Sequence, residues 1–249
     1  MKFQGGILSM ISKKAEDDLM AQITSAVDIR ERGNPLLAGG LLTEVINLCY
    51  DNCLDLICAR ALGERIVCSK HLFQKEGLQI YLNQMMDDIK KGKTLCVPES
   101  DHAVFYLRHG DVCASLGGHA NAETLYYQAH CLVNKGGREE AEYLGHYAEA
   151  LATNPDVTEE KLELAMDLLR KAFLILDDVP DEQLDIKHRL IILSGLHGRL
   201  AKVAVKSRCY ILAFKALTEC WRMSRELAHK HNYPMRLEQF WLRARGRGV

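Results

Sequence analysis

Apolar residues recur at intervals of three and four along almost the whole chain, and this periodicity limits the possible folds more than any other feature. Strict alternation of apolar and polar residues, which would indicate half-buried strands, is nearly absent. Glycines, prolines and polar turns interrupt the pattern and divide it into about ten amphipathic stretches. The sequence therefore predicts an all-α protein.

Each predicted helix ends at a recognisable breaker or begins at a residue suited to a helix start. Pro35 suits the first turn of the second helix, and Ser100, Thr158 and Pro180 mark the starts of the fifth, eighth and ninth. The predicted ranges are 12–32, 35–51, 54–75, 78–91, 100–117, 120–133, 138–153, 158–176, 180–206 and 208–231.

One predicted hairpin carries an ordered series of small and large residues: Tyr106, Gly110, Gly117, Ala122, Tyr126 and Ala129. The small side chains at Gly110 and Ala122 allow two helices to face each other closely, and the tyrosines fill the groove toward the next hairpin. This series resembles the tetratricopeptide repeat, whose unit of about 34 residues is a helical hairpin. The same order recurs less completely around four further anchors: Ala26, Gly63, Gly145 and Ala201.

The resemblance implies a right-handed α-solenoid of about five antiparallel helical hairpins, which stack because one hairpin cannot bury its apolar face alone. It covers residues 12–231 and leaves an N-terminal segment, 1–11, and a basic and aromatic C-terminal tail, 232–249. In that tail we expect Phe240 and Trp241 to cover the open end of the last hairpin. A different α-solenoid or an irregular helical domain is the alternative.

In the tetratricopeptide family the first helix of each hairpin lines a concave groove, which suits a peptide or a partner helix. We expect this surface to be exposed and to mix cationic and anionic side chains, as a groove for a zwitterionic or C-terminal peptide would. The family's carboxylate clamp is not evident at these positions. The residues that the resemblance places in the groove are Arg30, Arg60, Glu64, Leu107, Arg108, Asp111, Glu142, His146, Glu149, Arg199 and Lys202.

The overall charge favours neither nucleic acid nor an anionic membrane as a partner, because 32 Lys and Arg face 33 Asp and Glu. No signal peptide is apparent, and several of the 9 cysteines, among them Cys49, Cys53 and Cys220, fall on apolar helical faces. Reduced, buried thiols indicate a cytoplasmic protein. The short arginine-rich tail is poor evidence for nucleic-acid binding, and the sequence leaves the partner and the oligomeric state open.

The common catalytic and phosphate-binding motifs are missing, so we expect no catalysis, cofactor or metal. Our leading hypothesis is a protein- or peptide-binding scaffold. One alternative is a peptide-sensing regulatory protein similar to the bacterial pheromone receptors. The other is an enzyme or metal site on the face formed by Glu142, His146 and Glu149, with Glu139 one turn earlier.

Overall fold

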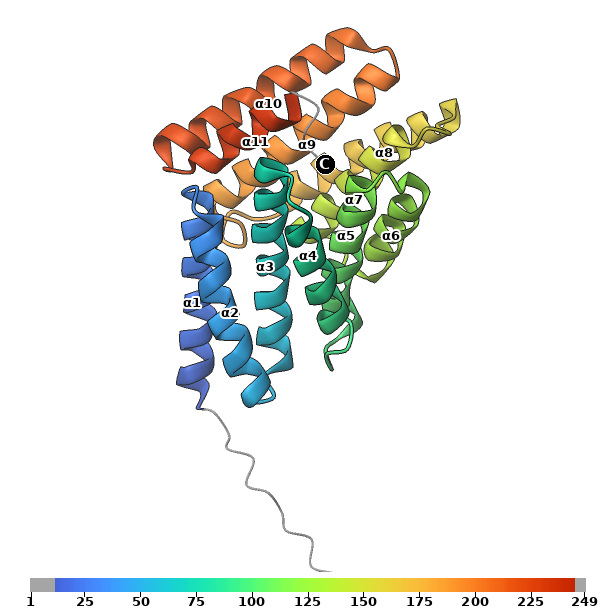
Figure 1. Ribbon diagram of the computed structural model, residues 1–249. Helices are drawn as coiled ribbons and strands as arrows, with labels where there is room; N and C mark the ends of the chain where they lie inside the picture. Colours follow the sequence, from blue (N-terminus) through green and yellow to red (C-terminus); the bar gives the residue numbers. More distant parts are fainter. Residues whose placement is uncertain (1–11, 245–249) are drawn as a thin grey trace, which may run out of the picture.

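The computed structural model describes residues 12–244, and every regular element in that range is a helix (Figure 1). The all-α prediction is therefore confirmed for the described residues. The eleven helices are α1 (Lys13–Glu31), α2 (Pro35–Asp51), α3 (Asp55–Glu76), α4 (Gln79–Gly92), α5 (Glu99–Ser115), α6 (His119–Leu132), α7 (Arg138–Thr153), α8 (Glu159–Asp178), α9 (Ile186–Lys206), α10 (Tyr210–Lys230) and α11 (Pro234–Ala244). None of them is long and apolar enough to cross a bilayer.

Local sequence explains several helix ends. The side chains of Ser12, Asn34 and Thr158 each accept a hydrogen bond from a backbone N–H in the first turn of α1, α2 and α8, at 3.3 Å in every case. Pro35 occupies the first turn of α2, where its missing N–H costs nothing. Gly77 ends α3 with a φ of 73°, a left-handed conformation that glycine adopts without a steric penalty.

Two of the predicted helix starts are wrong. Ser100 lies inside α5, whose first residue directly follows Pro98. The helix α9 begins well after Pro180, because Asp185 caps it. The carboxylate of Asp185 accepts hydrogen bonds from the N–H groups of the second and third residues of α9, at 2.9 and 3.1 Å. The start of α9 follows from the residue that satisfies the free N–H groups of its first turn, whereas α5 begins without a side-chain cap.

The odd-numbered helices form the inner layer of the molecule. Each helix packs on its successor, and α1, α3, α5, α7 and α9 also contact one another in that order. The last hairpin, α9 and α10, runs across the ends of the preceding helices (Figure 1). The helix α11 contacts α9 and α10 and also returns to α1, so the contacts among the inner helices form a closed circuit.

The helix α11 falls in the region that the sequence analysis treated as a tail. Tyr233 and Phe240 are buried on the body of the protein, while Trp241 is half exposed. The hydroxyl of Tyr233 also donates a hydrogen bond to the Asp28 carboxylate of α1, at 3.1 Å. The described part of the tail is therefore an eleventh helix that joins the two ends of the fold.

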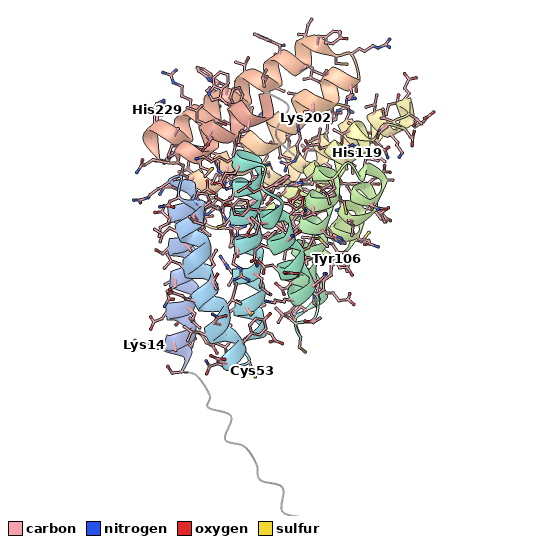
Figure 2. The ribbon with its side chains drawn as sticks, viewed as in Figure 1. Lys14, Cys53, Tyr106, His119, Lys202 and His229 are labelled. Atoms are coloured by element: carbon pink, nitrogen blue, oxygen red, sulfur yellow. The ribbon has the colours of Figure 1, made fainter. Side chains whose placement is uncertain are left out.

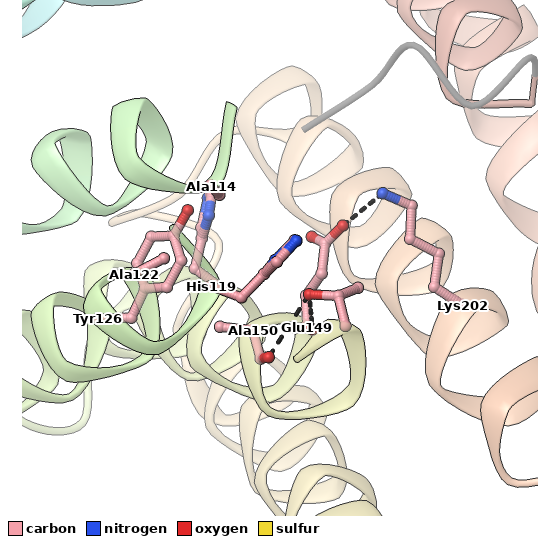
Figure 3. A pocket seen from close by; sticks show the side chains of 9 residues that line it. Ala114, His119, Ala122, Tyr126, Glu149, Ala150 and Lys202 are labelled. Atoms are coloured by element: carbon pink, nitrogen blue, oxygen red, sulfur yellow. Dashed lines mark hydrogen bonds and ion pairs between the residues drawn. The ribbon is translucent and has the colours of Figure 1, made fainter. Parts of the chain in front are cut away.

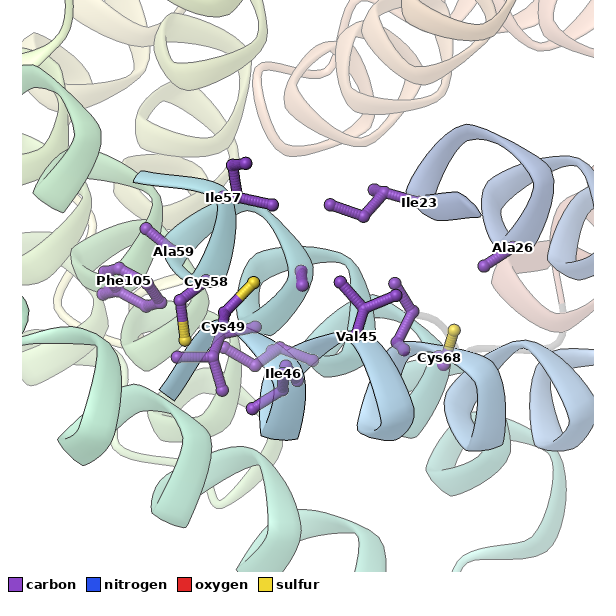
Figure 4. Close-up of a cluster of buried hydrophobic side chains, with 14 of the residues drawn as sticks. Ile23, Ala26, Val45, Ile46, Cys49, Ile57, Cys58, Ala59, Cys68 and Phe105 are labelled. Carbon is purple, nitrogen blue, oxygen red and sulfur yellow. The ribbon is translucent and has the colours of Figure 1, made fainter. Parts of the chain in front are cut away.

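The apolar core follows the hairpins as a series of separate clusters. The largest joins α1 to α5, and Figure 4 shows part of it around Ile23, Ile46 and Phe105. A second cluster lies among α7, α8 and α9, and a third lies among α5, α6 and α7. Each of these clusters joins helices of more than one consecutive pair.

Two of the anchor glycines, Gly63 and Gly145, take part in different contacts from those predicted. Gly110 approaches the ring of Tyr126 on α6, the helix that also carries Ala122: a Cβ added at Gly110 would lie 2.7 Å from that ring. Gly63 and Gly145 face the next inner helix, because their added Cβ atoms would lie 3.5 and 2.6 Å from side chains of α5 and α9. Gly63 and Gly145 therefore permit close packing between neighbouring hairpins.

All nine cysteines are free thiols. Cys49, Cys58, Cys68 and Cys220 are buried, as small apolar residues often are. Cys53 is exposed in the turn after α2, which corrects its assignment to an apolar helical face.

Candidate functional site

The inner helices surround a cavity of about 410 Å³. Its wall receives residues from α1, α3, α5, α7, α9 and α11, so segments far apart in the sequence meet there. Basic side chains outnumber acidic ones in this wall. The basic residues are Arg30, Arg60, Lys70, Arg108, Arg138, Arg199 and Arg236, and the acidic residues are Glu31, Glu64, Glu139 and Glu142.

Asp111 of α5 lies directly beneath the cavity wall and is 1% exposed. Its carboxylate is 2.9 Å from the ammonium of Lys70 and 3.1 Å from the guanidinium of Arg108, and it accepts a hydrogen bond from the Tyr126 hydroxyl at 2.9 Å. Burial alone would raise the pKa of Asp111, but Lys70, His146 and Arg108 hold that pKa well below its usual range. The carboxylate is therefore a fixed negative charge that anchors two cations of the wall.

His146 of α7 is held in one tautomer. Its Nε2 contacts the guanidinium of Arg199, which can only donate, so the ring proton must be on Nδ1. That Nδ1 is 3.4 Å from the Asp111 carboxylate. Burial and the neighbouring Arg199 lower the pKa of His146 to about 4, so the ring is neutral at pH 7. Glu142, 3.7 Å from Arg108, also has a lowered pKa because His146 and Arg108 outweigh its burial.

Glu149, one helical turn beyond His146, faces a second and smaller pocket of about 120 Å³. Figure 3 shows Lys202 extending from α9 to the Glu149 carboxylate, with His119 and Tyr126 on the opposite side. The guanidinium of Arg199 lies 3.3 Å from the same carboxylate. Lys202 and Arg199 lower the pKa of Glu149 against the effect of burial, so this carboxylate also stays charged.

A second polar network connects α11 to the wall. The Arg236 guanidinium donates to Glu31 at 2.6 Å, and Arg30 donates to the same oxygen at 3.0 Å. Gln239 contacts Nε2 of His71. The other oxygen of Glu31 and Nδ1 of His71 are buried without a hydrogen-bond partner among residues 12–244, although both residues line the cavity. Burial, Arg30 and Arg236 lower the pKa of His71 well below its usual value, so this ring is also neutral.

The structure brings most of the predicted groove residues to one cavity. Arg30, Arg60, Glu64, Arg108, Glu142, His146 and Arg199 all line it. Leu107 is instead fully buried in the core, and Asp111 is covered by its cationic partners. Glu149 and Lys202 line the smaller pocket and not the main cavity.

The sequence analysis missed Lys70 and His71 on α3, and Glu31, Arg236 and Gln239 of the α11 network. The α3 pair could have been found, because Lys70 and His71 continue the helical stripe that begins at Arg60 and Glu64. No sequence pattern places the α11 residues in the cavity, since the residues around position 236 do not show by themselves that the chain returns to α1.

Two expectations about exposure are wrong. The side chains of Arg108 and Arg199 are only 13% and 12% exposed, because both belong to the buried network. The second concerns Glu123, which the predicted hairpin places on an outer face but whose side chain is only 20% exposed. Its carboxylate instead contacts the ammonium of Lys161 at 2.8 Å and accepts from the Asn154 amide at 2.8 Å.

Among residues 12–244, no three His, Cys, Asp or Glu side chains gather as a metal site would require. No protein-family model, curated protein or solved structure matches the chain. The chemistry of the site therefore has to be derived from its own geometry.

Proposed function

We propose that this protein is a non-catalytic binding protein of the tetratricopeptide-repeat type. In this proposal α1–α10 are five hairpins of a right-handed α-solenoid, and α11 closes its concave side. The observation that carries the proposal is the cavity of about 410 Å³, with charged residues from six helices in its wall. Its size lies within the range of about 300–1,000 Å³ that is usual for pockets that bind one small ligand.

The balance of charge in the wall favours an anionic ligand. Seven basic residues face four glutamates there, and the buried Asp111 beneath them leaves an excess of two positive charges. Most of the basic residues are held by carboxylates, but Arg60 is exposed and forms no ion pair or hydrogen bond with any described residue. We infer that a short peptide with acidic side chains or a free C-terminal carboxylate binds here, with Arg60 as its accessible cationic contact.

The first test uses three fluorescein-labelled hexapeptides: an aspartate-rich peptide with a free C-terminus, the same peptide amidated at its C-terminus, and a lysine-rich peptide. Fluorescence anisotropy should show saturable binding of the aspartate-rich peptides and none of the lysine-rich peptide. Arg60→Glu should weaken that binding on the order of tenfold, which corresponds to the loss of one charged hydrogen bond of about 1.4 kcal/mol.

Lys90→Glu on α4 is the matched control, because Lys90 is an exposed cation outside both pockets. It should leave the affinity unchanged. Absence of saturable binding by all three peptides, or an equal loss in both variants, would contradict the proposal. A difference between the free and amidated peptides would show how much of the affinity comes from the terminal carboxylate.

The position of α11 favours a sensor as the second candidate function. Arg236 and Gln239 both line the cavity and both bind residues of the opposite wall. A ligand that displaced these contacts would change how α11 rests on α1, and binding would then alter the outer surface. Hydrogen exchange in α11 with and without bound peptide tests this candidate, because a scaffold without a sensing role would show no change there.

The face formed by Glu142, His146 and Glu149 offers less support for an enzyme. Arg199 contacts one ring nitrogen of His146 and Asp111 lies near the other, so neither nitrogen is free to take a proton from a ligand. Glu149 is engaged by Lys202. The free thiols at all nine cysteines agree with a reducing compartment, and we propose a cytoplasmic location.

A further inference from the structure

The charges of this nearly neutral chain are distributed unevenly. From Ile186 to Thr218, through α9 and the first half of α10, there is no acidic residue at all. The basic residues in this range are Lys187, Arg189, Arg199, Lys202, Lys206, Arg208 and Lys215. Arg199 and Lys202 both pair with Glu149, whereas Lys206, Arg208 and Lys215 are exposed and form no ion pair with any described residue.

Large apolar side chains are exposed beside these three cations. Ile211, Phe214 and Tyr210 are 78%, 73% and 66% exposed, and Val205 at the end of α9 is half exposed. Further along α10, Leu217 and Trp221 are also exposed. Tyr210, Phe214, Leu217 and Trp221 follow the spacing that places residues on one face of a helix. We call this surface, with Val205, Ile211 and the three cations, the α10 ridge.

The α10 ridge projects away from the body of the protein. Figure 1 shows the turn between α9 and α10 above α8 at the upper right of the molecule, and Figure 2 shows side chains around this turn directed outward. Arg208, in the turn, has a φ of 58°, a left-handed conformation that favours glycine or asparagine.

We propose that the α10 ridge docks on the surface of an anionic lipid bilayer. Lys206, Arg208 and Lys215 would face the headgroups, while Ile211, Phe214 and Val205 would enter the boundary between headgroups and acyl chains. Trp221, with its ring 5.3 Å from the Arg225 guanidinium, would lie at the interface, where tryptophan is favoured. Such docking needs no membrane-spanning helix.

Two features favour a bilayer over the other possible occupants. A second copy of the ridge would bring like charges together at Lys206 and Lys215, which opposes self-association. Nucleic acid would match the cations, but burial of Ile211 and Val205 gains free energy only in an apolar medium. An anionic bilayer offers both negative headgroups for the cations and an apolar medium for the exposed apolar side chains.

The test uses the full chain with vesicles of phosphatidylcholine, with and without phosphatidylserine. Co-sedimentation should show binding to the vesicles that contain phosphatidylserine and little to pure phosphatidylcholine. Raising the salt concentration should weaken it, since salt screens the exposed cations. In the Trp241→Phe variant Trp221 is the only tryptophan, and its emission should shift to shorter wavelength when anionic vesicles are added.

Matched variants distinguish the ridge from other exposed residues. Phe214→Asp and the double change Lys206→Glu with Lys215→Glu should each reduce binding at least tenfold. Leu37→Asp should not, although Leu37 is half exposed on α2, a helix without any Lys or Arg. The control for the charge change is Lys90→Glu with Lys91→Glu on α4, which removes the same charge elsewhere.

Three results would overturn the proposal. The first is equal binding to both kinds of vesicle, or to neither. The second is equal loss in the ridge variants and their controls. The third is a dimer of the unmodified protein in light scattering that Phe214→Asp converts to a monomer, because the ridge would then be an interface between copies. Failure of this test leaves the peptide-binding cavity unaffected, since the two surfaces share none of these residues.

Discussion

The cavity wall and the α10 ridge both present basic residues, but they hold them in different ways. In the wall, Lys70, Arg108 and Arg199 lie within 3.3 Å of a buried or half-buried carboxylate. On the ridge, Lys206 and Lys215 form no ion pair with any residue that the structure describes, and they lie beside exposed apolar side chains. Basic residues of the same chain therefore have two roles: those in the cavity wall are paired inside the fold, and those on the ridge are free to meet a partner.

The difference lies in the cost of removing a charge. A buried ion pair contributes little over an apolar pair of the same shape, but removing one member strands the other in a poorly solvated place. An exposed charge is solvated with or without a partner, so its removal hardly changes the free energy of unfolding. The wall should thus be intolerant of substitution, and the ridge should tolerate it.

The largest expected effect is at Asp111. Asp111→Ala removes the carboxylate that holds Lys70 and Arg108 and leaves the Tyr126 hydroxyl without its acceptor. We expect a loss of about 3–5 kcal/mol in the free energy of unfolding, measured by urea denaturation. Asp111→Asn keeps an acceptor for Tyr126 and should lose less. If Asp111→Ala and Lys206→Glu had the same urea midpoint, a charge in the cavity wall would be no more costly to remove than a charge on the ridge.

The inner helices should also resist larger side chains. Gly110→Leu should cost about 1–3 kcal/mol by overpacking, because Tyr126 is buried and its hydroxyl is bonded, so its ring cannot withdraw easily. Gly40→Ala on the exposed side of α2 is the control. An added Cβ there meets nothing within 4 Å, and alanine in a helix should stabilise by about 0.5–1 kcal/mol. Similar midpoints for both variants would contradict this packing.

Acid should destabilise the wall before its carboxylates titrate. The pKa of His146 is lowered to about 4 in the folded protein, against about 6.5 when unfolded, so the unfolded chain binds more protons between these values. Above pH 6.5 the His146 ring does not reduce the free energy of unfolding. As the pH falls from 6.5 toward 4, protonation of this ring in the unfolded chain lowers that free energy. At pH 5 the loss should be about 2 kcal/mol. His71 should add to it, since its pKa is also lowered.

Urea midpoints measured from pH 7.5 to pH 5 check this pH dependence. His146→Gln should flatten it, whereas His229→Gln, at an exposed position on α10, should leave it as in the unmodified protein. If the urea midpoint of the unmodified protein stayed constant from pH 7.5 to pH 5, the His146 ring would not be buried beside Arg199.

The smallest expected effect is on the ridge. Lys206→Glu should change the free energy of unfolding by less than about 0.5 kcal/mol, because the side chain is exposed and unpaired. The thermal midpoint should therefore be unchanged even though binding to anionic vesicles falls. A stability loss comparable to that of Asp111→Ala would mean that the ridge is part of the folded core's charge network.

The sequence by itself determined the helical class and most helix boundaries, because these depend on neighbouring residues. Periodic apolar positions, the cap at Thr158 and breakers such as Pro35 act within one or two turns. Seven of the predicted groove residues reached the cavity for the same reason, since the inward face of a helix follows from its own spacing. Pro180 misled the prediction because Asp185 competed with it as the helix start.

The tertiary structure alone decided which charges are buried and paired. Arg108 and Arg199 look like surface residues in the sequence, and only the approach of α5, α7 and α9 encloses them around Asp111 and Glu149. The pairing of Arg236 with Glu31 joins residues 205 positions apart, so no local pattern could indicate that α11 contributes to the cavity wall. Periodicity assigns each helix an inward face, whereas the partner of a buried charge depends on how distant helices meet.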